Sequence, residues 1–182
     1  MKRLLAFAPL LVLALVVVAA ALVLTRGGAR ETVSQGEALR PAPTFALASI
    51  DGGDPVTSDR FAGRAYVVNF FASWCTPCRA EHPQLTALSE QGVALLGVAY
   101  KDDADDTARF LRELGDPYEA VALDRDGRFG LEFGVAGAVP ETFVIDAQGR
   151  IVAVHRGPLA PEDVERVIAP ALRTAQRNGP AG

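Results

Sequence analysis

Between residues 41 and 178 the chain alternates short apolar runs with segments in which apolar and polar positions follow a helical period. Residues 65–72 and 93–100 are almost continuously apolar and rich in Val, Phe and Leu. Such runs are typical of strands that are buried on both faces of a sheet. The pattern therefore predicts buried strands separated by helices, which is the arrangement of an α/β protein.

The other elements are predicted from turn signals and from the ends of the periodic segments. We expect further strands at 44–48, 121–123, 142–145 and 151–155, and helices at 75–90, 105–114 and 161–177. The last two strands flank a turn at 146–149 and are interpreted as a hairpin. The order strand–helix–strand–helix, followed by a hairpin and a helix, predicts a mixed central sheet with helices on both faces.

The N-terminus follows a different pattern. Residues 4–24 contain no polar or charged side chain, and as a helix they would span roughly 30 Å of hydrocarbon. Lys2 and Arg3 precede this run, so the positive-inside rule places that end in the cytoplasm. We expect residues 1–24 to be a single-pass signal anchor, with the domain on the outer face of the membrane. A cleaved signal peptide, cut near 19–21, is the alternative, and either one exports the domain.

Residues 25–40 mix glycines, small polar residues and charges without a sustained apolar period, which predicts a flexible tether. The folded domain is then expected to cover residues 41–178. Without Lys2 and Arg3 the chain carries 16 basic and 22 acidic residues. A mildly acidic domain is a poor candidate for binding nucleic acid, and we expect no such partner.

The candidate chemistry lies in the only two cysteines, Cys75 and Cys78. They follow the buried strand at 65–72 and open the next helix, where unpaired N–H groups and the helix dipole stabilise a thiolate. A pair this close closes too small a loop to stabilise a fold, so disulfide exchange is the favoured interpretation. Cys75 would attack and Cys78 would resolve. Pro77 suits the first helical turn, and Trp74 is expected to shield the pair from water.

A metal site is the alternative use of these cysteines. Cys75, Cys78 and His82 lie on successive turns of the predicted helix. Structural zinc prefers four ligands, however, and the only other histidine, His155, lies on a distant strand. We therefore expect no metal and no cofactor, and interpret His82 as a surface residue. The acidic run at 102–106 could bind a metal or a partner, but a solvated helix start is the simpler interpretation.

Several motifs resemble those of known redox proteins. Residues 68–78, Val-Asn-Phe-Phe-Ala-Ser-Trp-Cys-Thr-Pro-Cys, resemble the active-site strand and turn of thioredoxin, and Pro83 matches the proline that kinks the following helix. More narrowly, roughly residues 41–170 resemble the DsbE/CcmG type, the membrane-tethered thioredoxins of cytochrome c maturation within the TlpA/thioredoxin family. Four further stretches carry this resemblance: Arg79-Ala80-Glu81-His82-Pro83, Tyr100-Lys101-Asp102-Asp103, Leu114-Gly115-Asp116-Pro117-Tyr118 and Pro140-Glu141-Thr142-Phe143.

This resemblance implies a thioredoxin-like fold and an exported thiol:disulfide oxidoreductase that is anchored in the cell inner membrane with its redox domain in the periplasm. Its substrate would be a disulfide in apocytochrome c or its thiol chaperone, which is reduced so that haem can be attached. A membrane dithiol donor of the DsbD/CcdA type would reduce the protein again. Two rival functions use the same cysteines: a general exported thioredoxin of the TlpA or ResA kind with other substrates, and a metallochaperone.

The resemblance also implies roles for residues outside the cysteine pair. Pro140 would be the cis-proline that faces the disulfide, and Val139 before it would present its backbone to an extended substrate strand. Trp74, Thr76 and Pro77 would complete the surface that contacts the substrate. The loop that ends at Pro140 is one residue longer than the family pattern Gly-Val-x-Gly-x-Pro.

Resolution by Cys78 also needs a group that accepts its proton. Asn69 stands where thioredoxin has a buried aspartate, and an amide cannot titrate. Two carboxylates are candidates: Glu81, three residues beyond Cys78 on the same helical face, and Glu141, directly after the proline loop. For each of them, a solvated surface carboxylate is the alternative interpretation.

Overall fold

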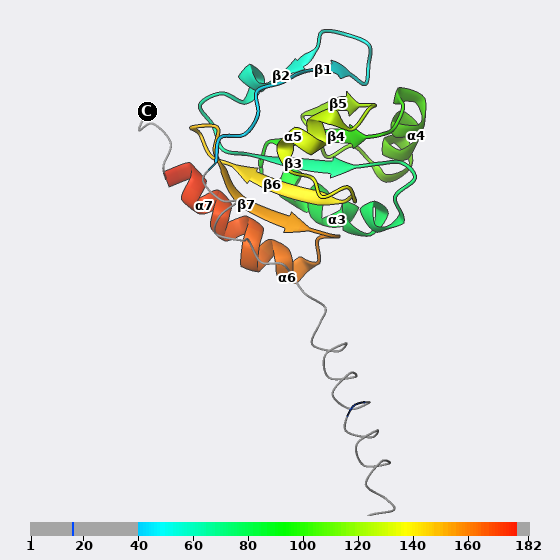
Figure 1. Cartoon of the computed structure of the whole chain (residues 1–182). Helices are drawn as coiled ribbons and strands as arrows, with labels where there is room; N and C mark the ends of the chain where they lie inside the picture. The colour runs from blue at the N-terminus through cyan, green and yellow to red at the C-terminus, as the bar shows by residue number, and fades with distance from the viewer. Residues whose placement is uncertain (1–15, 17–39, 178–182) are drawn as a thin grey trace, which may run out of the picture. The chain divides into compact units, whose positions relative to one another are not determined.

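The computed structural model describes residue 16 and residues 40–177 (Figure 1). Apart from residue 16, the predicted anchor at 1–24 lies outside the described residues, as does the predicted tether except for Arg40. Among the residues that the structure describes, no helix is long and apolar enough to cross a membrane. The strands and helices of the fold lie within residues 40–177.

Seven strands form one sheet. They are β1 (Ala46–Ser49), β2 (Val56–Thr57), β3 (Tyr66–Phe71), β4 (Leu95–Tyr100), β5 (Ala120–Asp124), β6 (Glu141–Ile145) and β7 (Ile151–Arg156). Their order across the sheet is β2-β1-β5-β4-β3-β6-β7. The central strands β3, β4 and β5 run parallel, whereas β6 and β7 pair antiparallel beside β3 (Figure 1). The predicted mixed central sheet is therefore confirmed.

Helices cover both faces of this sheet. They are α3 (Thr76–Glu90), α4 (Ala104–Leu114), α5 (Arg128–Phe133), α6 (Pro161–Asp163) and α7 (Ala169–Arg177), with a π-helical stretch between the last two. Side chains alternate along β3: Val67 packs with residues of α3 and α7, and Phe71 packs against α4. Phe70 points the other way and packs against two phenylalanines of α5. Asn69 therefore faces the same side as α3.

The predicted elements all occur, with ends that differ by no more than two residues from those expected. The structure adds β2, a short 3-10 helix at Ser58–Phe61, and α5. Helix α5 has only six residues, too few for a helical period to stand out in the sequence. It starts after Gly127, whose φ of 74° lies in the left-handed region that favours glycine.

A buried carboxylate fixes the start of α5. Asp124, the last residue of β5, accepts hydrogen bonds from the backbone N–H groups of Phe129 (3.1 Å) and Gly130 (2.8 Å). These are N–H groups of the first helical turn, which have no acceptor within the helix. Because α5 runs directly into the loop that carries Val139 and Pro140, Asp124 helps to determine where that loop begins.

The fold begins no later than Arg40, the residue that ends the predicted tether. Its carbonyl oxygen accepts a hydrogen bond from the N–H of Ile151 at 2.9 Å, and its guanidinium donates to the carbonyl oxygen of Phe133. Through these two bonds, Arg40 holds the N-terminal end of the domain against β7 and against the end of α5.

Replacing Asp124 by alanine should destabilise the protein. Two buried N–H groups lose their acceptor, so Asp124→Ala is expected to lower the free energy of unfolding by about 2–4 kcal/mol. Urea unfolding of the full-length protein in detergent measures the change. The matched control is Arg125→Ala at the exposed neighbouring position, which should change stability by no more than about 0.5 kcal/mol. Equal effects of the two substitutions would contradict the role of Asp124.

Candidate active site

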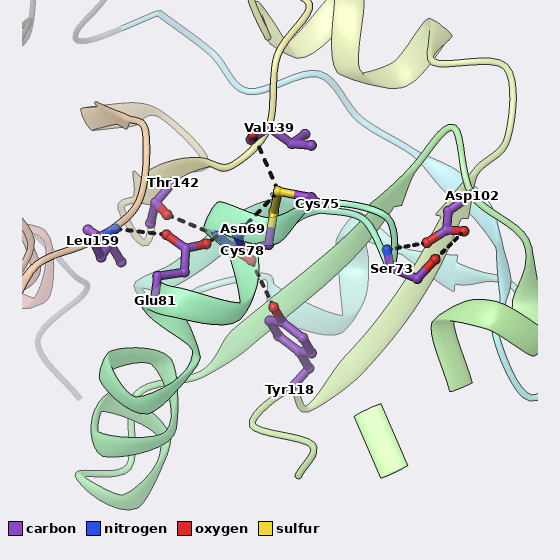
Figure 2. The surroundings of a disulfide bond; sticks show 10 residues. All are labelled: Asn69, Ser73, Cys75, Cys78, Glu81, Asp102, Tyr118, Val139, Thr142 and Leu159. Atoms are coloured by element: carbon purple, nitrogen blue, oxygen red, sulfur yellow. Dashed lines mark hydrogen bonds between the residues drawn. A yellow bond between two sulfur atoms is a disulfide. The ribbon is translucent and has the colours of Figure 1, made fainter. Parts of the chain in front are cut away.

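Cys75 and Cys78 form a disulfide at the start of α3, directly after β3 (Figure 2). Cys75 is the N-cap of α3, and its Sγ accepts a hydrogen bond from the N–H of Cys78 at 3.2 Å. Both cysteines are almost fully buried. The N–H groups at this helix end therefore favour a thiolate at Cys75 once the disulfide is reduced.

The neighbouring residues that were expected to contact substrate are exposed. Trp74 has 60% of its surface exposed, and its indole N–H donates to the carbonyl oxygen of Lys101 at 3.3 Å. Thr76 and Pro77 are exposed as well. Trp74 was expected to shield the pair; the structure shows that it offers a large apolar surface to solvent next to Cys75 in the chain.

The loop before β6 lies over the disulfide. The Val139–Pro140 peptide bond is cis, as predicted. The carbonyl oxygen of Val139 is 3.5 Å from Cys75 Sγ (Figure 2), and the carbonyl oxygen of Pro140 accepts a hydrogen bond from the N–H of Gly157 at 2.9 Å. The structure thus brings together the cysteine pair and the proline loop, which are about 60 residues apart in sequence.

Asp102 supports the turn that leads into Cys75. Its carboxylate accepts hydrogen bonds from the backbone N–H (2.6 Å) and the hydroxyl (3.0 Å) of Ser73 (Figure 2). The next residue, Asp103, is the N-cap of α4 and accepts from the N–H of Asp106 at 3.0 Å. The expected helix start in the acidic run is therefore present at Asp103, whereas the contact of Asp102 with the active-site turn was not predicted.

His82 is buried, so the expectation of a surface histidine was wrong. Its Nε2 lies 2.9 Å from the carbonyl oxygen of Gly115, and its ring packs edge-on against Phe110 of α4. Burial lowers the pKa of His82. Within the described part of the chain, no three or more His, Cys, Asp or Glu side chains are grouped so that they could hold a metal ion.

Glu81 is completely buried on α3, one turn after Cys78. Its Oε1 accepts a hydrogen bond from the Asn69 amide at 2.8 Å, and its Oε2 accepts from the backbone N–H of Leu159 at 2.9 Å (Figure 2). Burial raises the pKa of Glu81 to about 7, although the two hydrogen bonds act in the opposite direction. Glu81 is therefore not a solvated carboxylate, and it can exchange a proton near neutral pH.

Glu141 is also buried, but its contacts hold the proline loop. Its Oε1 accepts a hydrogen bond from the N–H of Ala136 at 2.7 Å, and its Oε2 lies 3.3 Å from Nε of Arg156 on β7. The interpretation as a solvated carboxylate is wrong for Glu141 too. The ion pair with Arg156 and the bond to Ala136 fit a residue that positions the loop.

Tyr118 is part of the site, although no role there was predicted for it from the sequence. Its hydroxyl donates to Asn69 Oδ1 at 2.8 Å, and the Asn69 amide also donates to Thr142 Oγ1 at 3.1 Å (Figure 2). Burial raises the pKa of Tyr118 well above its usual range. These partners come from β3, β6 and the loop before β5, so no local pattern reveals them. The motif at 114–118 is the one signal in the sequence that points to Tyr118.

Comparison with known proteins agrees with this geometry. The sequence profile of the Redoxin family matches residues 37–168. The chain belongs to the Redoxin family. It is 42% identical over 134 residues to the thiol:disulfide interchange protein HelX of Rhodobacter capsulatus, covering 73% of this chain and 76% of that protein. It is 44% identical over 133 residues to the thiol:disulfide interchange protein DsbE of Escherichia coli K12, covering 72% and 71%.

A solved structure shares the same fold. The crystal structure of a thiol:disulfide interchange protein DsbE from Chlorobium tepidum superposes with a TM-score of 0.65 at 29% identity, covering 76% of this chain and 97% of that one. This Redoxin-family protein is a thiol:disulfide oxidoreductase, as predicted. Since its sequence holds only Cys75 and Cys78, they are the pair able to exchange.

The raised pKa of Glu81 makes the stability of the protein depend on pH. The pKa is about 7 in the folded protein against 4.5 for an ordinary glutamate, so between these values the folded state binds more protons than the unfolded state. The stabilisation is complete below pH 4.5 and is lost as the pH rises through 7. At 1.36 kcal/mol per pKa unit, we expect the free energy of unfolding to fall by about 3 kcal/mol over this interval.

Glu81→Gln should remove this decline, because an amide does not titrate. Urea unfolding of both oxidised proteins between pH 4.5 and pH 8 measures it. His82 has the opposite effect, since its lowered pKa costs stability as the pH falls below 6.5. Both proteins contain His82, so the difference between them isolates Glu81. Parallel pH curves would show that Glu81 does not bind a proton in this range.

Proposed function

We propose that this protein reduces a disulfide in apocytochrome c, or in the thiol chaperone that carries it, during c-type cytochrome biogenesis. The similarity to DsbE and HelX supports this proposal, together with the motifs around the site. The observation that carries it is the placement of Cys75 at the N-terminus of α3, against the Val139–Pro140 loop, with the buried Glu81 on the same helix one turn after Cys78.

The chemistry transfers two electrons from the cysteine pair to the substrate. The Cys75 thiolate attacks one sulfur of the substrate disulfide, whose S–S bond breaks and leaves the other substrate sulfur as a thiolate. Cys78 then loses its proton, attacks Cys75 Sγ and releases the second substrate sulfur as a thiolate, and both substrate thiolates take up protons from water. The Cys75–Cys78 disulfide forms as the substrate becomes a dithiol. In this proposal Glu81 accepts the proton of Cys78.

The surroundings suit an extended peptide as substrate. Val139 and Pro140 would present backbone to it beside Cys75, and the exposed Trp74, Thr76 and Pro77 would contact its side chains. Glu141 would contribute to substrate binding indirectly, because its contacts hold the proline loop in place.

The proposal also includes where each part of the chain lies relative to the inner membrane. Residues 1–24 would anchor the protein in the inner membrane, residues 25–40 would act as a tether, and the domain at 41–178 would face the periplasm. A membrane dithiol donor of the DsbD/CcdA type would return Cys75 and Cys78 to the dithiol form. No cofactor takes part in this exchange.

A trapping experiment tests this function. In Cys78→Ser no thiol remains to resolve the mixed disulfide, so the substrate should stay bound to Cys75. Non-reducing gels of cells that make c-type cytochromes, followed by mass spectrometry, should identify the adduct as apocytochrome c or its thiol chaperone. Cys75→Ser is the matched control and should give no adduct.

Two results would contradict the proposal. Adducts made of many unrelated exported proteins would favour a general thioredoxin. An adduct with Cys75→Ser instead of Cys78→Ser would reverse the roles of the two cysteines.

A further inference from the structure

Each polar atom of the Glu81 carboxylate and of the Asn69 side-chain amide has a hydrogen-bond partner. The Asn69 amide nitrogen donates to Glu81 Oε1 and to Thr142 Oγ1, and Asn69 Oδ1 accepts from the Tyr118 hydroxyl. Leu159 N–H donates to the other Glu81 oxygen. Both carboxylate oxygens and both ends of the amide thus have partners. This arrangement suits Glu81 in its ionised form, in which it only accepts hydrogen bonds.

A protonated Glu81 does not fit the same arrangement. Leu159 N–H donates to Oε2, and the carbonyl oxygen of a carboxylic acid is a better acceptor than its hydroxyl oxygen, so the added proton would lie on Oε1. Oε1 is 2.8 Å from the Asn69 amide nitrogen, which is also a donor. Two donors would then face each other in a buried site. A buried donor without an acceptor costs about 1–3 kcal/mol.

A half-turn of the Asn69 amide about its terminal torsion removes this conflict. Asn69 Oδ1 would then accept from the Glu81 O–H and from the Thr142 hydroxyl, while its nitrogen would donate to the oxygen of Tyr118. Each hydroxyl can either donate or accept, so Thr142 and Tyr118 adapt by rotating their O–H bonds. The three contacts of the amide, with Glu81, Thr142 and Tyr118, again each join a donor to an acceptor, and no heavy atom outside the amide has to move.

We propose that Asn69 and Tyr118 are positioning residues for Glu81, and that the Asn69 amide reverses when Glu81 takes up a proton. This rests on the proposed role of Glu81 as acceptor of the Cys78 proton. It also accounts for an asparagine where thioredoxin has a titrating acid. An amide can present a donor to the carboxylate and an acceptor to the acid, and it adds no second charge to the buried site.

Other groups near this cluster titrate or carry charge and must be separated from Glu81. They are His82 on α3, Asp116 before β5, Glu141 on β6 with Arg156 on β7, His155 on β7 opposite Thr142, and Asp163 near His155. Cys75 and Cys78 have no titratable proton while they form the disulfide. The oxidised protein is therefore the form in which Glu81 can be followed without the cysteines.

The test is an NMR titration of the oxidised full-length protein in detergent micelles, from pH 5 to pH 9. The Glu81 Cδ shift reports its protonation, and the side-chain amide shifts of Asn69 report its hydrogen bonds. We expect both sets to move with one midpoint. Glu81→Gln is the matched variant, because its amide donates to Asn69 and accepts from Leu159 as the protonated acid does. Its Asn69 shifts at pH 8 should match those of the wild type at pH 5.

Either of two results would overturn the proposal: Asn69 shifts that stay constant through the Glu81 midpoint, or Glu81→Gln shifts at pH 8 that match the wild type at high pH. Tyr118→Phe tests the hydrogen bond on the other side of the Asn69 amide. If the amide reverses, the substitution removes one partner of the amide in both protonation states of Glu81, so the proton affinity of Glu81 should change less than about twofold. If Tyr118 instead holds the amide in one orientation, the substitution would free the amide to reverse, and the proton affinity of Glu81 would rise severalfold. If this proposal about Asn69 fails, the result expected of the trapping experiment with Cys78→Ser does not change.

Discussion

A buried carboxylate fastens the redox helix to the rest of the fold. Glu81 lies on α3, and its two oxygens are held by Asn69 on β3 and by the backbone of Leu159 before α6. Unpaired polar groups are costly in the interior, so α3 cannot shift against the sheet without breaking these bonds. The N-terminus of α3, which carries Cys75 and Cys78, is thereby held at the end of β3. The same burial raises the pKa of Glu81 to about 7, so the residue that holds α3 in place can also exchange a proton near neutral pH.

The loop that ends at Pro140 depends on a neighbouring part of the same framework. Glu141 joins the loop to β7 through Ala136 and Arg156, and Gly157 N–H donates to the carbonyl oxygen of Pro140. Gly157 lies two residues before Leu159, so one short segment contacts both the proline loop and Glu81. The disulfide and the loop that faces it therefore share a support, which fixes the position of one relative to the other.

The features that could be predicted from the sequence are the local ones. The apolar runs at 65–72 and 93–100 predict β3 and β4, because strands buried on both faces are apolar throughout. The spacing of Cys75 and Cys78 predicts a redox pair. The pairing of Asn69 with Glu81 could not be predicted, because it depends on how α3 sits on the sheet. His82 was misplaced for the same reason: its face of α3 is covered by α4, which nothing in its own helix indicates. Helix α5 was missed because six residues carry too little periodicity.

The most direct test is the rate at which Cys78 resolves a mixed disulfide. Rapid mixing of the reduced protein with a chromophoric aromatic disulfide releases one thiol on attack and a second on resolution. From pH 5 to pH 9 the wild-type resolution rate should rise and level off with a midpoint near 7, and Glu141→Gln should keep that midpoint. Glu81→Gln should lose the midpoint and resolve at least about tenfold more slowly above pH 7. An unchanged rate and midpoint in Glu81→Gln would show that Glu81 does not accept the proton of Cys78.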